Sequence, residues 1–212
     1  MKENKARKKN KASRASKENR GYNAEKNAIR KKMRQQRDEY DEIMRKKKSS
    51  EIMKMLQKQK EYENAEKICV YISKGSEVAT HEWIRDILEE GSKKVVVPVT
   101  DVQKRKITLS MLSDMRDLKQ GTYEILEPQE DKRNAVSPEQ VDLFIIPGIA
   151  FDGNCSRIGY GGGYYDKLLS TIKKPKIGVA YSFQIVQHIP KEKTDISVDK
   201  VITEKEVYGK DT

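Results

Sequence analysis

The sequence has 212 residues, enough for one domain of ordinary size with an extension, or for two small domains. Its formal charge of +11 is concentrated in residues 1–50, which hold 19 of the 44 basic residues and 7 of the 33 acidic ones. No apolar run approaches the roughly 18 residues of a membrane span, and Cys69 and Cys155 suggest neither a disulfide framework nor a zinc-ligand spacing. We expect a cytoplasmic protein without a membrane segment or signal peptide.

The N-terminal segment differs in composition from the rest of the chain. Residues 1–21 contain no Leu, Ile, Val, Phe, Trp or Tyr, so they cannot bury enough apolar surface to offset their conformational entropy. This composition predicts a disordered basic tail over 1–21 and a single domain over 22–212. The first part of that domain, residues 22–66, is expected to form two helices. Asn23 is a plausible cap for a helix that reaches about Arg45, and Ser50 for one that reaches about Ala65.

Short apolar runs follow the helical segment and predict buried strands. They cover residues 68–73, 95–99, 107–112, 143–146, 177–181 and, more weakly, 198–203. Between the first two runs lies a helix that Thr80 can cap and Gly91 can end. The pattern predicts the α/β class, namely a three-layer Rossmann-like domain with a mostly parallel central sheet, preceded by the N-terminal helices.

Four glycines lie within five positions, at Gly159, Gly161, Gly162 and Gly163, just after Arg157. Glycines let the backbone bring several N–H groups against an anion, and the helix expected to begin near Gly163 adds its N-terminal dipole. We interpret the loop as a phosphate cradle, with a tight turn of packing glycines as the alternative. It matches neither the Walker A nor the dinucleotide-binding fingerprint.

The residues around this loop favour a planar, phosphorylated ligand. Tyr160, Tyr164 and Tyr165 can stack on a planar group, and Asp166 offers a carboxylate suited to Mg²⁺ beside phosphates. The whole segment AFD–RIGYGGGYYDKLL follows IIPG and precedes IGVAYSFQIVQHIP and TDISVDKVIT. With Lys-Asn-Ala-Ile-Arg at 26–30 and Glu-Val-Ala-Thr at 77–80, it resembles the 5-formyltetrahydrofolate cyclo-ligase family, also called methenyltetrahydrofolate synthetase, over residues 26 to about 203.

The resemblance implies an enzyme that converts 5-formyltetrahydrofolate and ATP to 5,10-methenyltetrahydrofolate, ADP and phosphate with Mg²⁺. In the family's chemistry the formyl oxygen attacks the γ-phosphate, the neighbouring amine closes the ring, and phosphate leaves. The protein then mainly aligns the reactants and stabilises charge, which accords with the absence of an evident nucleophile and base pair in the sequence.

The resemblance also assigns roles to residues. Arg157 and Tyr160 are the implied catalytic residues, and Asp166 with Asp195 the implied metal ligands, Asp199 being the alternative to Asp195. The ATP contacts it implies are Lys26, Arg30, Arg157, Ile158, Gly159, Tyr160, Gly161, Gly162, Gly163, Tyr164 and Tyr165. The folate contacts it implies are Ile72, Glu77, Tyr160, Gly161, Gly162, Gly163 and Tyr164, while Tyr123 either stacks on folate or packs internally.

Two residues depart from the family pattern. Cys155 stands where a glycine is common, so the backbone there must tolerate a side chain or the loop must take another course. Lys167 replaces an arginine, which matters only if that residue binds in a bidentate manner.

Two other functions remain as alternatives. One is a different phosphate-handling enzyme on the same fold, although such an enzyme needs no N-terminal Lys26 and Arg30 clamp. The other is a nucleic-acid-binding protein that uses the basic N-terminus, although no known binding motif accompanies the charge. We expect a monomer whose partners are ATP and 5-formyltetrahydrofolate, with no membrane and no specific nucleic acid.

Overall fold

The computed structural model describes residues 21–209. The predicted tail over 1–21 lies outside the described residues except for Gly21, which is helical. The first described helix covers residues 21–38, so Asn23 lies inside it and is not its cap. A break at 39–41 separates it from α2 (Glu42–Gln57), which contains Ser50, so the predicted second helix boundary was also wrong. The boundary is set by Asp41, whose carboxylate accepts a hydrogen bond from the Met44 N–H.

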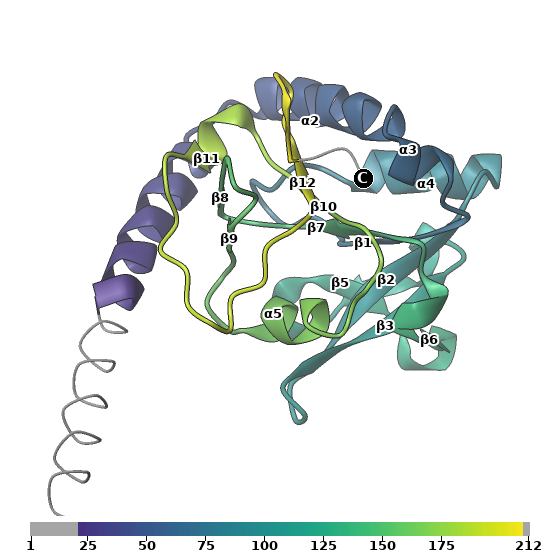
Figure 1. Cartoon of the computed structure of the whole chain (residues 1–212). Helices are drawn as coiled ribbons and strands as arrows, with labels where there is room; N and C mark the ends of the chain where they lie inside the picture. Colours follow the sequence, from purple (N-terminus) through teal and green to yellow (C-terminus); the bar gives the residue numbers. More distant parts are fainter. Residues whose placement is uncertain (1–20, 210–212) are drawn as a thin grey trace, which may run out of the picture.

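The central sheet has eight strands in the order β13-β12-β10-β7-β1-β2-β3-β6 (Figure 1). Their bounds are β1 Lys67–Val70, β2 Lys94–Asp101, β3 Lys106–Leu112, β6 Asn134–Val136, β7 Leu143–Ile146, β10 Lys176–Val179, β12 Lys200–Ile202 and β13 Val207–Gly209. The five neighbours β12, β10, β7, β1 and β2 pair in parallel, while the outer pairs β12–β13, β2–β3 and β3–β6 are antiparallel. The expectation of a mostly parallel sheet is confirmed.

Two smaller sheets extend this core. One contains β11 (Ile185–Val186), β8 (Ala150–Asp152) and β9 (Arg157–Ile158), and the other pairs β4 (Leu118–Gln120) with β5 (Leu126–Pro128). Short 3₁₀ turns cover Met115–Asp117, Thr122–Glu124, Glu130–Lys132, Pro138–Gln140 and Ser182–Gln184. The three-stranded sheet matters for function, because β9 leads directly into the glycine loop.

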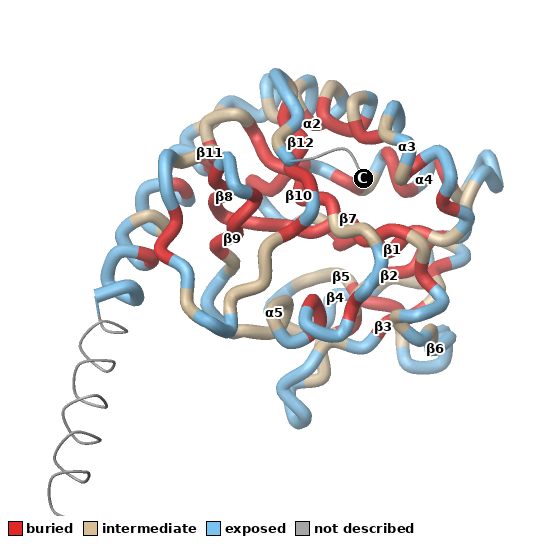
Figure 2. The backbone as a smooth tube through the Cα atoms, in the orientation of Figure 1, coloured by how far each residue is buried: buried red, intermediate tan, exposed pale blue. Residues whose placement is uncertain are grey.

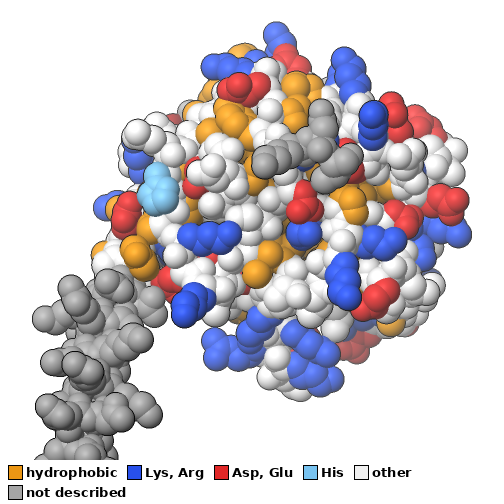
Figure 3. All heavy atoms as spheres, in the orientation of Figure 1, with side chains coloured by type: hydrophobic (Ala, Val, Ile, Leu, Met, Phe, Trp, Pro, Cys, Tyr) orange, Lys and Arg blue, Asp and Glu red, His pale blue; other side chains and the backbone are white. Residues whose placement is uncertain are grey.

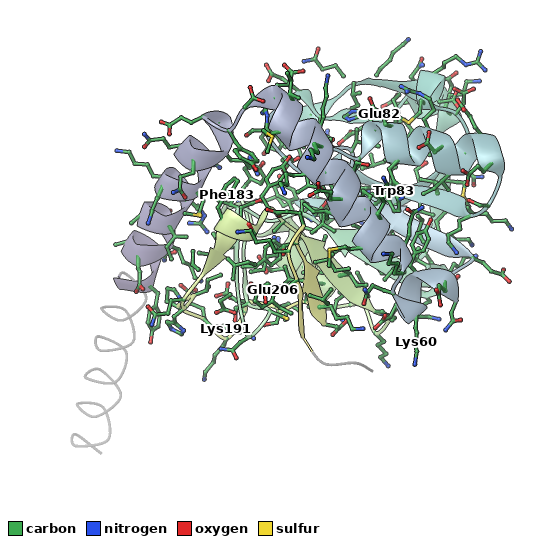
Figure 4. All side chains as sticks on the ribbon, turned by 90° about the horizontal axis from the view of Figure 1, so that it is seen from above. Lys60, Glu82, Trp83, Phe183, Lys191 and Glu206 are labelled. Carbon is green, nitrogen blue, oxygen red and sulfur yellow. The ribbon has the colours of Figure 1, made fainter. Side chains whose placement is uncertain are left out.

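Helices cover both faces of the sheet. On one face lie α2, the short α3 (Lys60–Glu63) and α4 (His81–Glu90), and Trp83 of α4 lies toward α2 and α3 when seen from above (Figure 4). On the other face lies α5 (Tyr164–Leu169), whose Leu168 and Leu169 pack against Phe144 and Phe151. Buried residues follow β1, β7 and β10 through the centre of the molecule (Figure 2). This arrangement is the three-layer α/β architecture that the sequence predicts.

No helix within residues 21–209 combines the length and the apolar composition that crossing a bilayer requires.

Candidate functional site

Three segments far apart in sequence meet beyond the carboxyl ends of the parallel strands, where α/β proteins usually bind ligands. They are the helix 21–38, the loop 71–80 after β1, and the segment 157–169 that carries the glycine loop. Met33 of the helix packs against Ile149 and Ile158 of the three-stranded sheet, and Figure 1 shows the helix running alongside β8 and β11. This contact fixes the helix beside the glycine loop.

One face of this helix lies against the site and carries both basic and apolar side chains. Lys26, Arg30, Met33 and Arg37 follow one another at spacings of four, three and four residues, which places them on one helix face. Lys26, Met33 and Arg37 are each at most 5% exposed. A lysine and an arginine buried on the same face are not an ordinary solvated basic surface, because burying charge is costly unless it is paired.

Both predicted ATP cations of the helix contact the glycine-loop side of the site. Lys26 Nζ donates to Asp195 Oδ2 at 2.5 Å, and Arg30 Nε donates to the Gly159 carbonyl oxygen at 2.9 Å. Burial and the neighbouring Arg34 lower the pKa of Arg30 from its usual value. The guanidinium thus lies partly desolvated beside another cation, which favours binding of an anion.

The glycine loop has the backbone geometry that its composition predicts. Gly161 and Gly163 have φ angles of 99° and 69°, in the left-handed region that side chains disfavour, and α5 begins directly after Gly163. Gly159 matters for a different reason: a Cβ atom there would lie 2.6 Å from Arg157 Nη1, so the guanidinium would have to shift. The predicted residues 158–165 therefore run from the end of β9 through the glycine loop into α5, beside Arg157.

Arg157 is buried and incompletely paired. Its Nη2 donates to Asp166 Oδ1 at 3.0 Å, and its guanidinium lies 5.5 Å from the centre of the Tyr165 ring. Its Nε is buried with no hydrogen-bond partner among the described residues. An unpaired buried donor on a cation costs free energy in the absence of a ligand, so it is suited to receive an anionic oxygen.

The two predicted metal ligands lie close together. The backbone N–H of Ile196, the residue after Asp195, donates to Asp166 Oδ1 at 3.5 Å, and both carboxylates remain partly exposed. Asp199 does not reach them, because it accepts from the Lys176 N–H at 2.7 Å, where β10 and β12 begin, at the opposite end of the sheet. Of the two candidates for the second carboxylate, only Asp195 is placed in the site.

No three acidic, histidine or cysteine side chains within residues 21–209 are grouped so that they could hold a metal ion alone. Two carboxylates that leave most of the coordination sphere to a ligand and water suit Mg²⁺ bound together with phosphates.

Glu77 lies on the other side of the glycine loop. Its Oε1 accepts the Tyr160 hydroxyl at 2.6 Å, and its Oε2 accepts the Lys74 N–H at 2.9 Å. Burial and the nearby Glu77 carboxylate raise the pKa of Tyr160 to about 12, so its hydroxyl remains a donor. Ile72, in contrast, is 3% exposed and packs in the main core, so the structure does not present its side chain to this site.

The sequence analysis missed Arg37. Its Nη2 donates to the Tyr160 hydroxyl oxygen and its Nε to Ser76 Oγ, both at 3.0 Å. Arg34 lies 4.9 Å above the Tyr160 ring. The signal that points to Arg37 is its position seven residues after Arg30, two turns along the same helix face.

The remaining aromatic and basic residues lie at the outer edge of the site. Tyr123 is 61% exposed, and its ring meets that of Tyr164 edge to face at 6.4 Å, so it neither packs internally nor lies apart from the loop. Lys167 Nζ donates to the Arg105 carbonyl oxygen at 3.2 Å, a single surface contact. Basic side chains gather at the lower edge of the face in Figure 3, over the tip of the β2–β3 hairpin that contains Arg105.

Cys155 takes the left-handed backbone conformation, with a φ angle of 60°, although its side chain is buried. The backbone at this position therefore has the turn that glycine favours, although the residue carries a side chain. This conformation reduces the stability of the fold by roughly 1–2 kcal/mol.

We predict that Cys155→Gly is more stable than Cys155→Ala by about 1 kcal/mol, the reverse of the usual order, because both lose the sulfur but only glycine relieves the strained φ angle. Chemical denaturation of the two variants measures this difference. An alanine variant as stable as the glycine variant would show that the turn imposes no such preference.

Comparison with known proteins is consistent with this geometry. Residues 22–204 match the family described as the 5-formyltetrahydrofolate cyclo-ligase family. The mitochondrial 5-formyltetrahydrofolate cyclo-ligase of Arabidopsis thaliana is 30% identical over 204 residues, covering 84% of this chain and 74% of that protein. The solved 5,10-methenyltetrahydrofolate synthetase of Aquifex aeolicus superposes with a TM-score of 0.77 at 34% identity, covering 87% and 92% of the two chains. That of Mycoplasma pneumoniae gives a TM-score of 0.68 at 26% identity, covering 85% and 99%.

Proposed function

The chain belongs to the 5-formyltetrahydrofolate cyclo-ligase family, and we propose that it uses ATP and Mg²⁺ to cyclise 5-formyltetrahydrofolate to 5,10-methenyltetrahydrofolate, releasing ADP and phosphate. The observation that carries the proposal is the convergence of Lys26, Arg30 and Arg157 on one side of the glycine loop while Glu77 lies on the other. A cationic and an acidic subsite separated by one loop suit a reaction between a nucleotide phosphate and a second, uncharged ring.

The cationic side binds the triphosphate. Lys26 and Arg30 supply charge from the helix, and Arg157 offers its unpaired Nε and a planar guanidinium that matches phosphate oxygens. Backbone N–H groups of the glycine loop add neutral donors. Asp166 and Asp195 would hold Mg²⁺, which when bound neutralises part of the phosphate charge and helps to orient the γ-phosphate.

The acidic side binds the pterin ring. A carboxylate accepts the ring's amino and ring N–H donors in pairs, and Glu77 is buried enough to give that contact selectivity. Tyr160 lies between the two sides, with Arg34 over its ring and its hydroxyl on Glu77. We assign it, with Arg157, the alignment of the formyl oxygen toward the γ-phosphate.

The reaction needs alignment and charge stabilisation more than it needs a base. The formyl oxygen forms a bond to the γ-phosphorus as ADP leaves, and the secondary amine of the folate then attacks the formyl carbon. This attack closes the ring, the amine loses its proton, and phosphate departs with the former formyl oxygen. A formyl oxygen is a weak nucleophile, so holding it in line with the phosphate supplies most of the acceleration.

The experiment follows the near-ultraviolet absorbance of the methenyl product as it forms from 5-formyltetrahydrofolate. We expect the increase in absorbance to require both ATP and Mg²⁺, to stop when EDTA is added, and to resume with excess Mg²⁺. Absorbance that grows without ATP, or a folded protein that gives none with both present, would contradict the proposal.

We further propose that the enzyme acts as a cytoplasmic monomer and needs no nucleic acid. Light scattering after size-exclusion chromatography tests the first point, with one chain per particle expected. Deleting residues 1–20 tests whether the basic N-terminus contributes, and we expect turnover to change by less than about twofold because, within residues 21–209, the site's contacts begin at Lys26.

A further inference from the structure

Arg37 has no part in the proposed phosphate contacts, yet it is one of the most buried charged residues within 21–209, at 5% exposed. Its guanidinium bridges two segments on the folate side, through Ser76 Oγ and the Tyr160 hydroxyl oxygen, each at 3.0 Å. Ser76 immediately precedes Glu77, and Tyr160 donates to the Glu77 carboxylate. The group that surrounds Glu77 is therefore organised by a residue of the N-terminal helix.

The direction of these hydrogen bonds is fixed by the chemistry of arginine. A guanidinium only donates, so the Tyr160 oxygen must accept from Arg37, and the single hydroxyl proton is left for Glu77 Oε1. Tyr160 is 52% exposed and lies between Gly159 and Gly161, so apart from Arg34 over its ring it is the Arg37 hydrogen bond that directs the hydroxyl toward Glu77. Arg37 thus determines both where the hydroxyl lies and what it donates to.

The Glu77 carboxylate keeps room for a ligand in this arrangement. A carboxylate offers about four acceptor positions, two on each oxygen. Tyr160 takes one on Oε1, and the Lys74 N–H takes one on Oε2. One position on each oxygen remains, which is the number that a pair of parallel N–H donors requires. Two donors from the protein thus hold the carboxylate and still leave it able to accept a pair of hydrogen bonds.

We propose that Arg37 is a positioning residue for folate binding: through Tyr160 and Ser76 it fixes the orientation of the Glu77 carboxylate that receives the pterin. This rests on the proposed function. Arginine suits the role better than lysine, because its fork donates in two directions at once, toward Ser76 and toward Tyr160. Since Arg30 lies on the same helix, the helix takes part in both subsites.

The test compares Arg37→Met and Arg37→Lys with Lys32→Met, an exposed lysine on the same helix. For Arg37→Met we expect a rise of about tenfold in KM and in the calorimetric Kd for 5-formyltetrahydrofolate, with KM for ATP changed by less than about twofold. Arg37→Lys retains the charge and can donate in one of the two directions, so its KM and Kd for 5-formyltetrahydrofolate should rise only about threefold. Lys32→Met should match the wild type, because its charge change is the same and it makes none of these contacts.

A double variant separates positioning from a general structural role. If Arg37 acts mainly through Tyr160, Arg37→Met combined with Tyr160→Phe binds 5-formyltetrahydrofolate no more weakly than Tyr160→Phe alone. Additive losses, or equal rises in KM for ATP and for folate, would overturn the inference. So would a wild-type KM for folate in Arg37→Met. A wild type that neither binds nor cyclises 5-formyltetrahydrofolate would instead overturn the proposed function, and this inference with it.

Discussion

Replacing Lys26 by methionine is expected to lower kcat/KM for ATP by about 100-fold, close to 3 kcal/mol of binding and alignment energy. The variant loses a buried cation on the phosphate side of the site. It also leaves the Asp195 carboxylate, which Lys26 contacts at 2.5 Å, without its partner beside an incoming triphosphate. Loss of attraction and new repulsion act in the same direction, so the effect should be among the largest of any single change.

Steady-state kinetics with ATP varied at saturating 5-formyltetrahydrofolate measures this effect. Lys32→Met removes an exposed lysine from the same helix and should leave kcat/KM for ATP within about twofold of the wild type. Thermal unfolding of Lys26→Met shows whether the helix has come away from the domain. If Lys26→Met is folded and has normal ATP kinetics, the helix is not part of the nucleotide subsite.

Replacing Glu77 by glutamine should produce a loss of similar size on the other substrate. We expect kcat/KM for 5-formyltetrahydrofolate to fall by about 100-fold while KM for ATP changes by less than about threefold. Glutamine can still accept from Tyr160 or from the Lys74 N–H, but its amide group presents donors where the pterin presents donors as well. The change therefore removes one acceptor, adds a clash of donors and eliminates the charge.

The matched control for this prediction is Glu82→Gln, on the exposed face of α4. This variant should leave kcat/KM for 5-formyltetrahydrofolate and for ATP unchanged. If Glu77→Gln instead raised KM for ATP and spared folate, the two subsites would have to be exchanged between the two sides of the glycine loop.

The α/β architecture could be predicted from the sequence because its signals are local. Each parallel strand lies in a continuous apolar run. The helix before β2 has its own stop signal, Gly91, which takes the left-handed conformation with a φ angle of 61°. The break between the first helix and α2 was missed. A charged, helix-favouring segment continues through 39–41, and the Asp41 cap is one of several polar residues that could have served.

The site was predictable where a motif is contiguous and unpredictable where it depends on contacts over long distances in sequence. The glycine loop, Lys26, Arg30 and Glu77 are all brought to one end of the sheet. Arg37 was not found, because its partners lie 39 and 123 residues away along the chain.

Two further assignments needed the sheet topology. Asp195 and Asp199 are four residues apart, yet only the first lies at the ligand-binding end, since the chain enters β12 directly after Asp199. The folate contact expected of Ile72 stays a prediction: its side chain packs in the main core, and the position of a residue just beyond a strand end does not determine the direction of its side chain.

The most direct test of the account follows the formyl oxygen itself. When 5-formyltetrahydrofolate labelled with ¹⁸O in the formyl group is converted with unlabelled ATP in ordinary water, the account predicts one ¹⁸O atom in each phosphate released, detectable by mass spectrometry. Phosphate that carries no label, with the ¹⁸O found in water, would mean that the formyl oxygen never bonds to the γ-phosphorus, and the phosphate and folate subsites would then not be parts of one phosphoryl-transfer site.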